Sequence, residues 1–252
     1  MTQELHTPTA DSRTTLGHPS YIWTDGLERR LQLLRRYVPL EGKRILDIGC
    51  GIGTFVNRLR EFSPQVYGVD IDEPRVSEGA RHLPGLGLAV GEHLPFHDAT
   101  FDVILLHEVI EHVTNDVETL AEANRVLVPD GRIAIFCPNR LYPFETHGVY
   151  LGQRYVFGNI PLVNYLPDGL RNRLVPHARI YSKRRLRRLW RRLPLQPVVF
   201  TQVYPGFDHI IAKRGTLGRL IKAALYPLEN TGLRIFGLSH FVVLKRKSDG
   251  SF

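Results

Sequence analysis

The sequence is poor in cysteine, with 2 in 252 residues, which argues against a disulfide framework or a cysteine-rich metal site. Cys50 and Cys137 both lie at the ends of apolar runs, so we expect buried, reduced thiols. No apolar run approaches the roughly twenty residues that a membrane-spanning helix needs. The first residues are polar and hold no apolar signal core, so we expect a flexible tail over residues 1–20 of a cytoplasmic protein.

Apolar residues make up 43% of the chain, enough for one large core with insertions. Short apolar runs alternate with helical patterns, a rhythm typical of an α/β fold with a doubly wound, mostly parallel sheet and helices on both faces. The pattern predicts strands at 44–48, 66–70, 86–90, 102–106, 131–137, 197–204 and 240–245. It predicts helices at 26–37, 53–62, 74–81, 116–127, near 216–227, and at 181–193 with Ser182 as N-cap.

Three alternating glycines follow the first predicted strand. Gly49, Gly51 and Gly53 lack Cβ atoms, so the chain can turn sharply and approach a ligand closely. Asp70 ends the next strand, where a carboxylate can accept hydrogen bonds from both hydroxyls of a ribose. Asp47 precedes the glycines and would repel a pyrophosphate, which favours a nucleotide-type cofactor with a cationic amino-acid end. The glycines alone are also compatible with a tight turn that binds nothing.

Four motifs, in order, resemble those of the class I S-adenosylmethionine-dependent methyltransferases. They are Ile45–Gly53, Gly68–Asp72, Leu94–Ile104 and Leu127–Ile135. The segment His107–Val113 is most similar to the methyltransferase type 11/12 subgroup that includes the ubiquinone-biosynthesis O-methyltransferases. This resemblance covers about residues 40 to 140. It implies a Rossmann-like seven-stranded sheet with antiparallel final strands, and S-adenosyl-L-methionine as the cofactor.

The resemblance also implies cofactor-binding roles. Asp47, Gly49 and Gly51 would line the methionine and ribose part, Asp70 would hold the ribose hydroxyls, and Ile71 would pack on the adenine. The backbone of His107 would face the cofactor. One position departs from the family pattern, because Val90 stands where relatives often carry an acid that reads the adenine amino group. Gly91 and Glu92 are candidates to replace that contact, and Cys50 and Gly53 complete the cofactor-binding set.

A second set of polar residues follows the fourth predicted strand. If a helix begins there, Glu108, Glu111 and His112 share one face. Two carboxylates and an imidazole can bind a divalent metal or deprotonate a hydroxyl group. The ubiquinone-type resemblance associates this set with Mg²⁺, with Glu108 and His112 as catalytic candidates. The alternative is that Glu111 and His112 only cap and orient a loop.

The loop after the fifth strand supplies substrate candidates. Arg140, Tyr142 and His147 would face the transferred methyl group if this loop folds over the pocket, and His147 is a further catalytic candidate. His177, before the basic helix, is a candidate substrate residue. A proline-stiffened lid that only excludes water is the alternative for the loop.

Charge divides the chain unevenly. Residues 151–252 hold 19 Lys or Arg and 4 Asp or Glu, whereas residues 1–150 hold 14 and 21. We expect one methyltransferase domain over 21–252, with a cofactor-binding half at 21–137 and a basic substrate-side half at 138–252. Segments 138–180, which we expect to be irregular, and 205–237 would be insertions that build the substrate pocket.

The helix predicted over residues 181–193 is the most basic part of that half. It places Leu186, Leu189, Trp190 and Leu193 on one face, surrounded by arginines. One interpretation is attraction to an anionic surface, either membrane or nucleic acid, and the apolar residues nearby favour peripheral contact with an anionic membrane. The other is an ordinary surface helix that docks on the core through its Leu and Trp residues.

These features predict a methyltransferase that uses S-adenosylmethionine to methylate an oxygen of a small-molecule, lipid-linked or glycan acceptor. The alternatives are a tRNA or other nucleic-acid methyltransferase, which lacks support from any RNA-binding signature, and an S-adenosylmethionine-binding protein without transfer activity.

Overall fold

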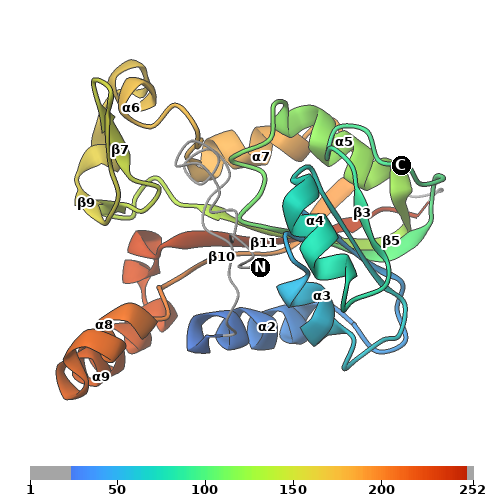
Figure 1. Cartoon of the computed structure of the whole chain (residues 1–252), viewed down its shortest axis with the longest axis horizontal. Coiled ribbons are helices and arrows are strands. Elements are labelled where there is room, and N and C mark those ends of the chain that lie inside the picture. The colour runs from blue at the N-terminus through green and yellow to red at the C-terminus, as the bar shows by residue number, and fades with distance from the viewer. Residues whose placement is uncertain (1–23, 249–252) are drawn as a thin grey trace, which may run out of the picture.

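A seven-stranded sheet runs through the centre of the molecule, whose computed structural model describes residues 24–248 (Figure 1). The strand order is β10-β11-β5-β4-β1-β2-β3. Neighbouring strands are parallel except at β11, which is antiparallel to both β5 and β10. This confirms the predicted α/β fold with a mostly parallel sheet. The strands are β1 Ile45–Ile48, β2 Val66–Asp70, β3 Leu86–Leu88, β4 Phe101–His107, β5 Leu127–Pro138, β10 Leu195–Val203 and β11 Ser239–Arg246. The tail predicted over residues 1–20 lies outside the described residues.

Helices cover both faces of the sheet. Helices α5 (Asp116–Val126) and α7 (Lys183–Trp190) pack on one face, and α2 (Asp25–Tyr37) and α3 (Thr54–Leu59) pack on the other. Helix α4 (Glu73–Ala80) lies beside β2 and β3. Side chains of β1 point alternately to the two faces of the sheet. Leu46 and Ile48 pack in the apolar cluster with α5 and α7, and Ile45 packs in the cluster with α2 and α3.

Side chains at the helix starts explain where several helices begin. Thr24, Asp72, Asn115 and Ser182 each accept hydrogen bonds from backbone N–H groups in the first turn of α2, α4, α5 and α7. The N-cap predicted at Ser182 is therefore confirmed. Helix α3 instead begins at Gly53, whose φ of 88° suits glycine.

The apolar face of α7 belongs to the core. Leu186, Leu189 and Trp190 are 0%, 7% and 6% exposed and pack against the sheet. As the second interpretation expects, its leucines and tryptophan dock it on the body of the protein. Arg184, Arg187 and Arg188 of this helix are exposed.

The first insertion, residues 138–180, is more regular than predicted. It contains β6 (Phe144–Glu145) paired with β9 (Ile160–Pro161), and β7 (Val149–Leu151) paired with β8 (Arg154–Val156). It ends in η1 (Val163–Tyr165) and α6 (Asp168–Leu174). Val149, Val163, Val175 and Ala178 form its own small apolar cluster, which explains how a segment rich in Pro and Gly holds a defined shape.

The second insertion, residues 205–237, is helical. It comprises α8 (Asp208–Arg214), α9 (Thr216–Leu225), η2 (Tyr226–Asn230) and η3 (Gly232–Phe236). The predicted helix near 216–227 is confirmed as α9, whereas α8 was not predicted. A Cβ at Gly218 would lie 2.7 Å from Ile211 Cα, so this glycine permits the close crossing of α8 and α9. Of the helices in residues 24–248, none has both the length and the apolar character needed to cross a bilayer.

Candidate cofactor and acceptor site

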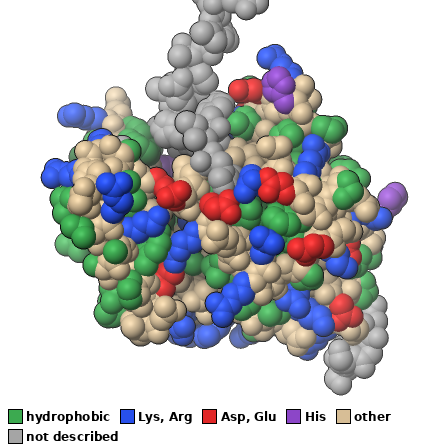
Figure 2. Space-filling view, turned by 90° about the horizontal axis from the view of Figure 1, so that it is seen from below, with side chains coloured by type: hydrophobic (Ala, Val, Ile, Leu, Met, Phe, Trp, Pro, Cys, Tyr) green, Lys and Arg blue, Asp and Glu red, His purple; other side chains and the backbone are tan. Residues whose placement is uncertain are grey.

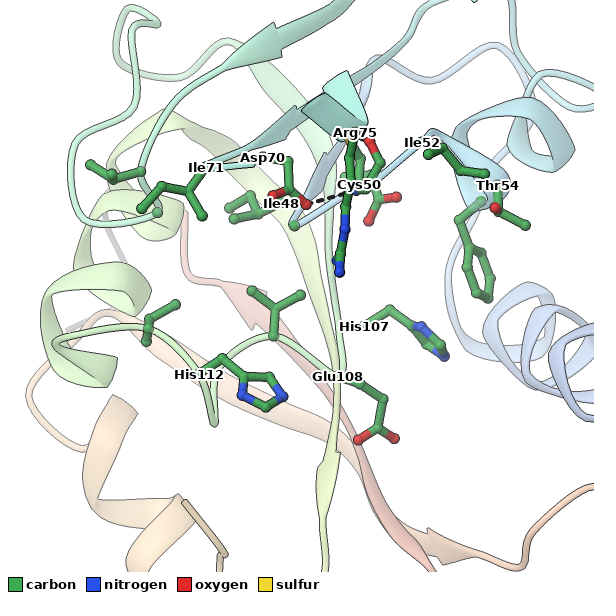
Figure 3. Close-up of a pocket in the computed structure, with 18 of the residues that line it drawn as sticks. Ile48, Cys50, Ile52, Thr54, Asp70, Ile71, Arg75, His107, Glu108 and His112 are labelled. Atoms are coloured by element: carbon green, nitrogen blue, oxygen red, sulfur yellow. Dashed lines mark hydrogen bonds between the residues drawn. The ribbon is translucent and has the colours of Figure 1, made fainter. Parts of the chain in front are cut away.

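A cavity of about 550 Å³ lies at the carboxyl ends of β1, β2 and β4. Ligands of open α/β sheets commonly bind at this edge. Figure 3 shows Asp70, Ile71 and Cys50 on one side of the cavity and His107, Glu108 and His112 across from them. The cavity thus has a wall made by the glycine loop and a wall made largely by titratable side chains.

The glycine loop and Asp70 are held together by backbone hydrogen bonds. Gly49 N and Cys50 N donate to Val69 O at 2.7 and 3.0 Å. Gly51 N donates to Asp70 Oδ2 at 2.7 Å, the dashed line in Figure 3, and Asp72 N donates to Asp70 Oδ1 at 2.9 Å. The carboxylate of Asp70 is therefore fixed in orientation at the cavity wall.

Two glycines of the loop are required by geometry. Gly49 has a φ of 76°, and a Cβ there would lie 2.2 Å from Val109 Cγ2. Gly53 has a φ of 88°, and a Cβ there would lie 2.7 Å from Leu83 Cδ1. Gly51 is different, since its φ is 55° but a Cβ would meet nothing within 4 Å. The chain conformation, and at Gly49 and Gly53 also the packing, therefore demands glycine.

Asp47 brings a second carboxyl group to the same wall. It is 3% exposed and lines the cavity. Burial, together with the negative charge of Asp70, raises the pKa of Asp47 well above its usual value. A cationic ligand group beside Asp47 would stabilise the ionised form, which is the chemistry expected for the amino-acid end of S-adenosylmethionine. The residues present therefore fit that cofactor.

The remaining predicted cofactor residues also line the cavity. Ile71 is 59% exposed, so a large apolar surface is available to an aromatic ring there. Gly91 and Glu92 lie on the same side. Glu92 Oε1 accepts a hydrogen bond from Asn115 N at 2.9 Å, so this carboxylate also supports the start of α5.

Arg30 from α2 organises the residues after β4. Its Nη1 donates to His107 Nε2 at 2.7 Å and lies 2.8 Å from Glu108 Oε1, and its Nη2 donates to Ser239 Oγ at 2.9 Å. Burial, assisted by the charge of Arg30, lowers the pKa of His107 to about 3, so this imidazole is neutral. Burial works to raise the pKa of Glu108, but the charge of Arg30 outweighs it and the pKa is lowered.

The predicted magnesium set is not assembled as expected. Glu108 is engaged by Arg30 and Ser239, and Glu111 is 1% exposed with no donor for either carboxylate oxygen within the described chain. Burial and the charge of Glu108 raise the pKa of Glu111, and its protonated carboxyl group can then donate to Glu108. Glu108 already pairs with Arg30, and burial disfavours the ionised form of Glu111, so these two side chains do not suit Mg²⁺, which prefers ionised oxygen ligands.

Glu111, His112 and His147 form a different group, with one potential ligand atom from each lying within 4.8 Å of the others. Two imidazoles and one carboxyl group suit zinc or iron better than magnesium.

Three histidines form the wall opposite Asp70. His112 Nδ1 lies 2.9 Å from His177 O, and His177 Nε2 lies 3.0 Å from His147 O. Because a carbonyl oxygen only accepts, each of these nitrogens carries the proton in the neutral ring. His112 Nε2 is therefore left as an acceptor. The rings of His112 and His147 are 5.2 Å apart.

His147 is positioned from behind by a buried ion pair. Its Nδ1 lies 2.9 Å from Glu145 Oε1, and Glu145 Oε2 accepts from Arg171 Nη2 at 2.7 Å. Glu145 is 2% exposed and Arg171 is fully buried. Burial works to raise the pKa of Glu145, but His147 and Arg171 outweigh it and lower the pKa to about 2. The carboxylate therefore stays ionised and directs His147 Nε2 away from itself.

Two predicted substrate residues lie elsewhere. Arg140 pairs with Asp168 and donates to Leu166 O at 2.7 Å, so it holds the first insertion together. The ring of Tyr142 packs at a tilt of 59° against Phe144, and burial raises the pKa of Tyr142 to about 12. Neither lines the cavity, because the loop after β5 folds into its own lobe and contributes Thr146 and His147 instead.

Sequence reasoning missed three contributors to this site. Arg30 reaches the cavity from α2, and Tyr155 and Phe157 reach it from the β7–β8 pair. No sequence motif marks these residues, and only the folded chain brings them to the cavity.

Comparisons with known proteins agree with this geometry. Residues 46–135 match a family model described as a methyltransferase domain. The ubiquinone biosynthesis O-methyltransferase of Azoarcus sp. strain BH72 is 30% identical over 147 residues, which cover 56% of this chain and 60% of that protein. This chain spans only 40 to 60% of the length of eight curated relatives that it matches.

Solved structures show the same fold over most of the chain. An S-adenosylmethionine-dependent methyltransferase from Mesorhizobium loti superimposes with a TM-score of 0.58 at 17% identity, covering 85% of this chain and 96% of that one. The [4+2]-cyclase SpnF superimposes with a TM-score of 0.59 at 18% identity, covering 92% and 86%. The ordered sequence motifs and the domain match identify residues 46–135 as a class I S-adenosylmethionine-dependent methyltransferase domain, and the sheet order agrees with this.

Proposed function

We propose that this protein transfers the methyl group of S-adenosylmethionine to a hydroxyl oxygen of an acceptor bound in the cavity. The observation that carries the proposal is the pairing of two walls in one cavity. Asp47 and Asp70 fit the methyl donor, and the histidines opposite them fit a hydroxyl group that must lose a proton. The similarity to ubiquinone biosynthesis O-methyltransferases supports an oxygen acceptor.

On the donor side of the cavity, the protein only has to bind and orient the cofactor. Asp70, fixed by Gly51 N and Asp72 N, would accept hydrogen bonds from the ribose hydroxyls, and Asp47 would accept them from the ammonium group. The exposed face of Ile71 would pack on the adenine. When bound, S-adenosylmethionine supplies an activated methyl group on a positively charged sulfur.

The acceptor end removes a proton. The acceptor oxygen would attack the methyl carbon in line with the breaking carbon–sulfur bond, and the hydroxyl proton would pass to an imidazole nitrogen. His112 Nε2 and His147 Nε2 are the available acceptors, because the Nδ1 atoms of both rings are held by oxygen atoms. Burial, first of all, lowers the pKa of His112 to about 4, so this ring is neutral at physiological pH.

The test separates binding from transfer. We would incubate the protein with methyl-labelled S-adenosylmethionine and lipid, glycan and tRNA fractions, and compare the wild type with His112→Gln/His147→Gln. The double variant should keep its affinity for the donor and lose about a hundredfold or more in transfer rate.

His97→Gln is the matched control, since His97 is an exposed histidine away from the cavity. Wild-type transfer by the double variant would refute the histidine role. Tight donor binding without labelled product in any fraction would favour a binding protein, and label confined to tRNA would favour a nucleic-acid methyltransferase.

A further inference from the structure

Large apolar side chains that remain exposed gather on the two insertions. Of sixteen such residues in the described chain, seven lie in the first insertion and four in the second, although the insertions make up only about a third of that chain. We call these eleven side chains the apolar rim: Leu141, Phe144, Leu151, Phe157, Leu162, Tyr165, Leu170, Leu217, Leu220, Leu233 and Phe236.

The first insertion lines the cavity, and the second contacts α2 beside it. Phe157 is 61% exposed and also lines the cavity, so the rim reaches the opening itself. Asp208 Oδ2 of α8 accepts from Gly26 N at 3.2 Å, directly beside the lining residue Leu27. Asn139 Nδ2, at the start of the first insertion, donates to Ile235 O and Gly237 O at the end of the second, each at 2.7 Å. In Figure 1 the two insertions form the left end of the molecule, above and below its centre.

The exposed face of α9 combines apolar and cationic side chains. Leu217 and Leu220 are 47% and 62% exposed and lie three residues apart on the helix. Arg219 of α9, together with Lys213 and Arg214 at the end of α8, is exposed as well, and these three residues take part in none of the ion pairs found in residues 24–248.

The acids of this insertion are already engaged by α2. Glu229 pairs with Arg29, and Asp208 accepts from the backbone of Gly26. The second insertion therefore presents positive charge to its surroundings. Figure 2 shows hydrophobic and basic side chains lying together at the left, the end at which Figure 1 places α8 and α9.

We propose that the apolar rim docks on an anionic lipid bilayer, with the mouth of the cavity facing the membrane. The aliphatic side chains would enter the interfacial region while Lys213, Arg214 and Arg219 meet the headgroups. Nucleic acid would use the cations and could stack on the four aromatic side chains of the rim, but it would leave the seven leucines of the rim exposed, because single strands are bound by stacking on aromatic rings. For that reason the membrane explains more of this surface.

This orientation defines the class of acceptor, an inference that rests on the proposed function. A cavity opening onto a bilayer receives an amphiphile whose polar hydroxyl-bearing head enters while its apolar tail stays in the membrane. The docking itself requires no transfer activity and can be tested alone.

The experiment measures binding to vesicles of phosphatidylglycerol and phosphatidylcholine in equal parts, and to vesicles of phosphatidylcholine alone, by sedimentation. We expect the wild type to bind the anionic vesicles more tightly. Leu217→Ser/Leu220→Ser should weaken binding about thirtyfold, since each leucine has roughly half its surface left to bury. Arg214→Gln/Arg219→Gln should weaken binding and reduce its sensitivity to salt.

Leu88→Ser/Val117→Ser is the matched control, because these residues are 56% and 52% exposed but lie outside the insertions. It should bind as the wild type does, and all variants should bind S-adenosylmethionine equally. A wild type that remains in the supernatant, or equal binding by Leu217→Ser/Leu220→Ser and the control, would overturn the proposal. So would tighter binding to a single-stranded RNA that displaces vesicles, or a dimer in light scattering that Leu217→Ser/Leu220→Ser abolishes.

Discussion

Breaking the buried pair of Arg171 and Glu145 from one side should destabilise the fold far more than breaking an ion pair at the surface. Arg171 is fully buried and Glu145 is 2% exposed, and their N–O distance is 2.7 Å. Replacing either with methionine leaves the other charge buried without its partner, which costs about 3–5 kcal/mol. Arg171→Met also loses the hydrogen bond from Nη1 to Ala178 O at 2.6 Å.

The double variant Arg171→Met/Glu145→Met removes both charges together. Because no uncompensated charge remains, its loss of unfolding free energy should be well below the sum of the single losses, with a coupling energy of at least about 2 kcal/mol. Guanidinium unfolding followed by circular dichroism measures all four corners of the cycle.

The same variants connect stability to function. In the double variant the chain stays folded but His147 loses the carboxylate that fixes its ring at 2.9 Å. We therefore expect methyl transfer to fall while S-adenosylmethionine binding is retained. Three results would contradict this prediction. They are a loss of less than about 1 kcal/mol of unfolding free energy in the single variants, additive losses in the double variant, and a wild-type transfer rate in the double variant.

Two further predictions concern the loop and the core. Gly49→Ala should weaken S-adenosylmethionine binding more than tenfold, because Gly49 has a φ of 76° and an added Cβ would collide with Val109. Gly87→Ala is the control, because an added Cβ there has no heavy atom within 4 Å and should leave the affinity unchanged. Equal affinities of the two variants in calorimetry would contradict this. His240 is 1% exposed and burial lowers its pKa from 6.5 to about 4, so the unfolded chain takes up a proton at higher pH than the folded one. The neutral His240 therefore contributes fully to the free energy of unfolding above pH 6.5, and this contribution falls by about 3 kcal/mol as the pH drops from 6.5 through 4. Denaturant melts at pH 7, 5.5 and 4 measure this loss, and His240→Gln should remove it.

The sequence predicted the fold wherever a local signal was strong. The strand at 66–70 was placed at its observed bounds, because Val66 to Val69 is apolar and Asp70 ends it. Strand β5 begins at Leu127 rather than near residue 131, because the chain passes from α5 into the sheet at once and accommodates Asp130, with a φ of 64°, within the strand.

The acceptor side was harder to predict because its contacts are remote in sequence. Glu145 and Arg171 are 26 residues apart, and His147 and His177 are 30 apart, with no periodic pattern to connect them. Arg140 and Tyr142 were expected at the cavity from their nearness to His147, but the lobe turns them away. By contrast, the donor side is built from the consecutive residues of the glycine loop and from Asp70 at the end of one strand. Both are visible as local patterns in a single sequence.

Isothermal calorimetry of S-adenosylmethionine binding to the wild type and to Asp70→Ala tests whether the cavity holds the methyl donor. The carboxylate of Asp70 can accept two hydrogen bonds from the ribose hydroxyls, each worth about 1.5–3 kcal/mol. We predict saturable binding by the wild type and an affinity at least a hundredfold weaker in the variant, with the unfolding temperature of both measured as a control for folding. No binding by the wild type, or equal affinity in a folded variant, would contradict the assignment of this cavity to S-adenosylmethionine.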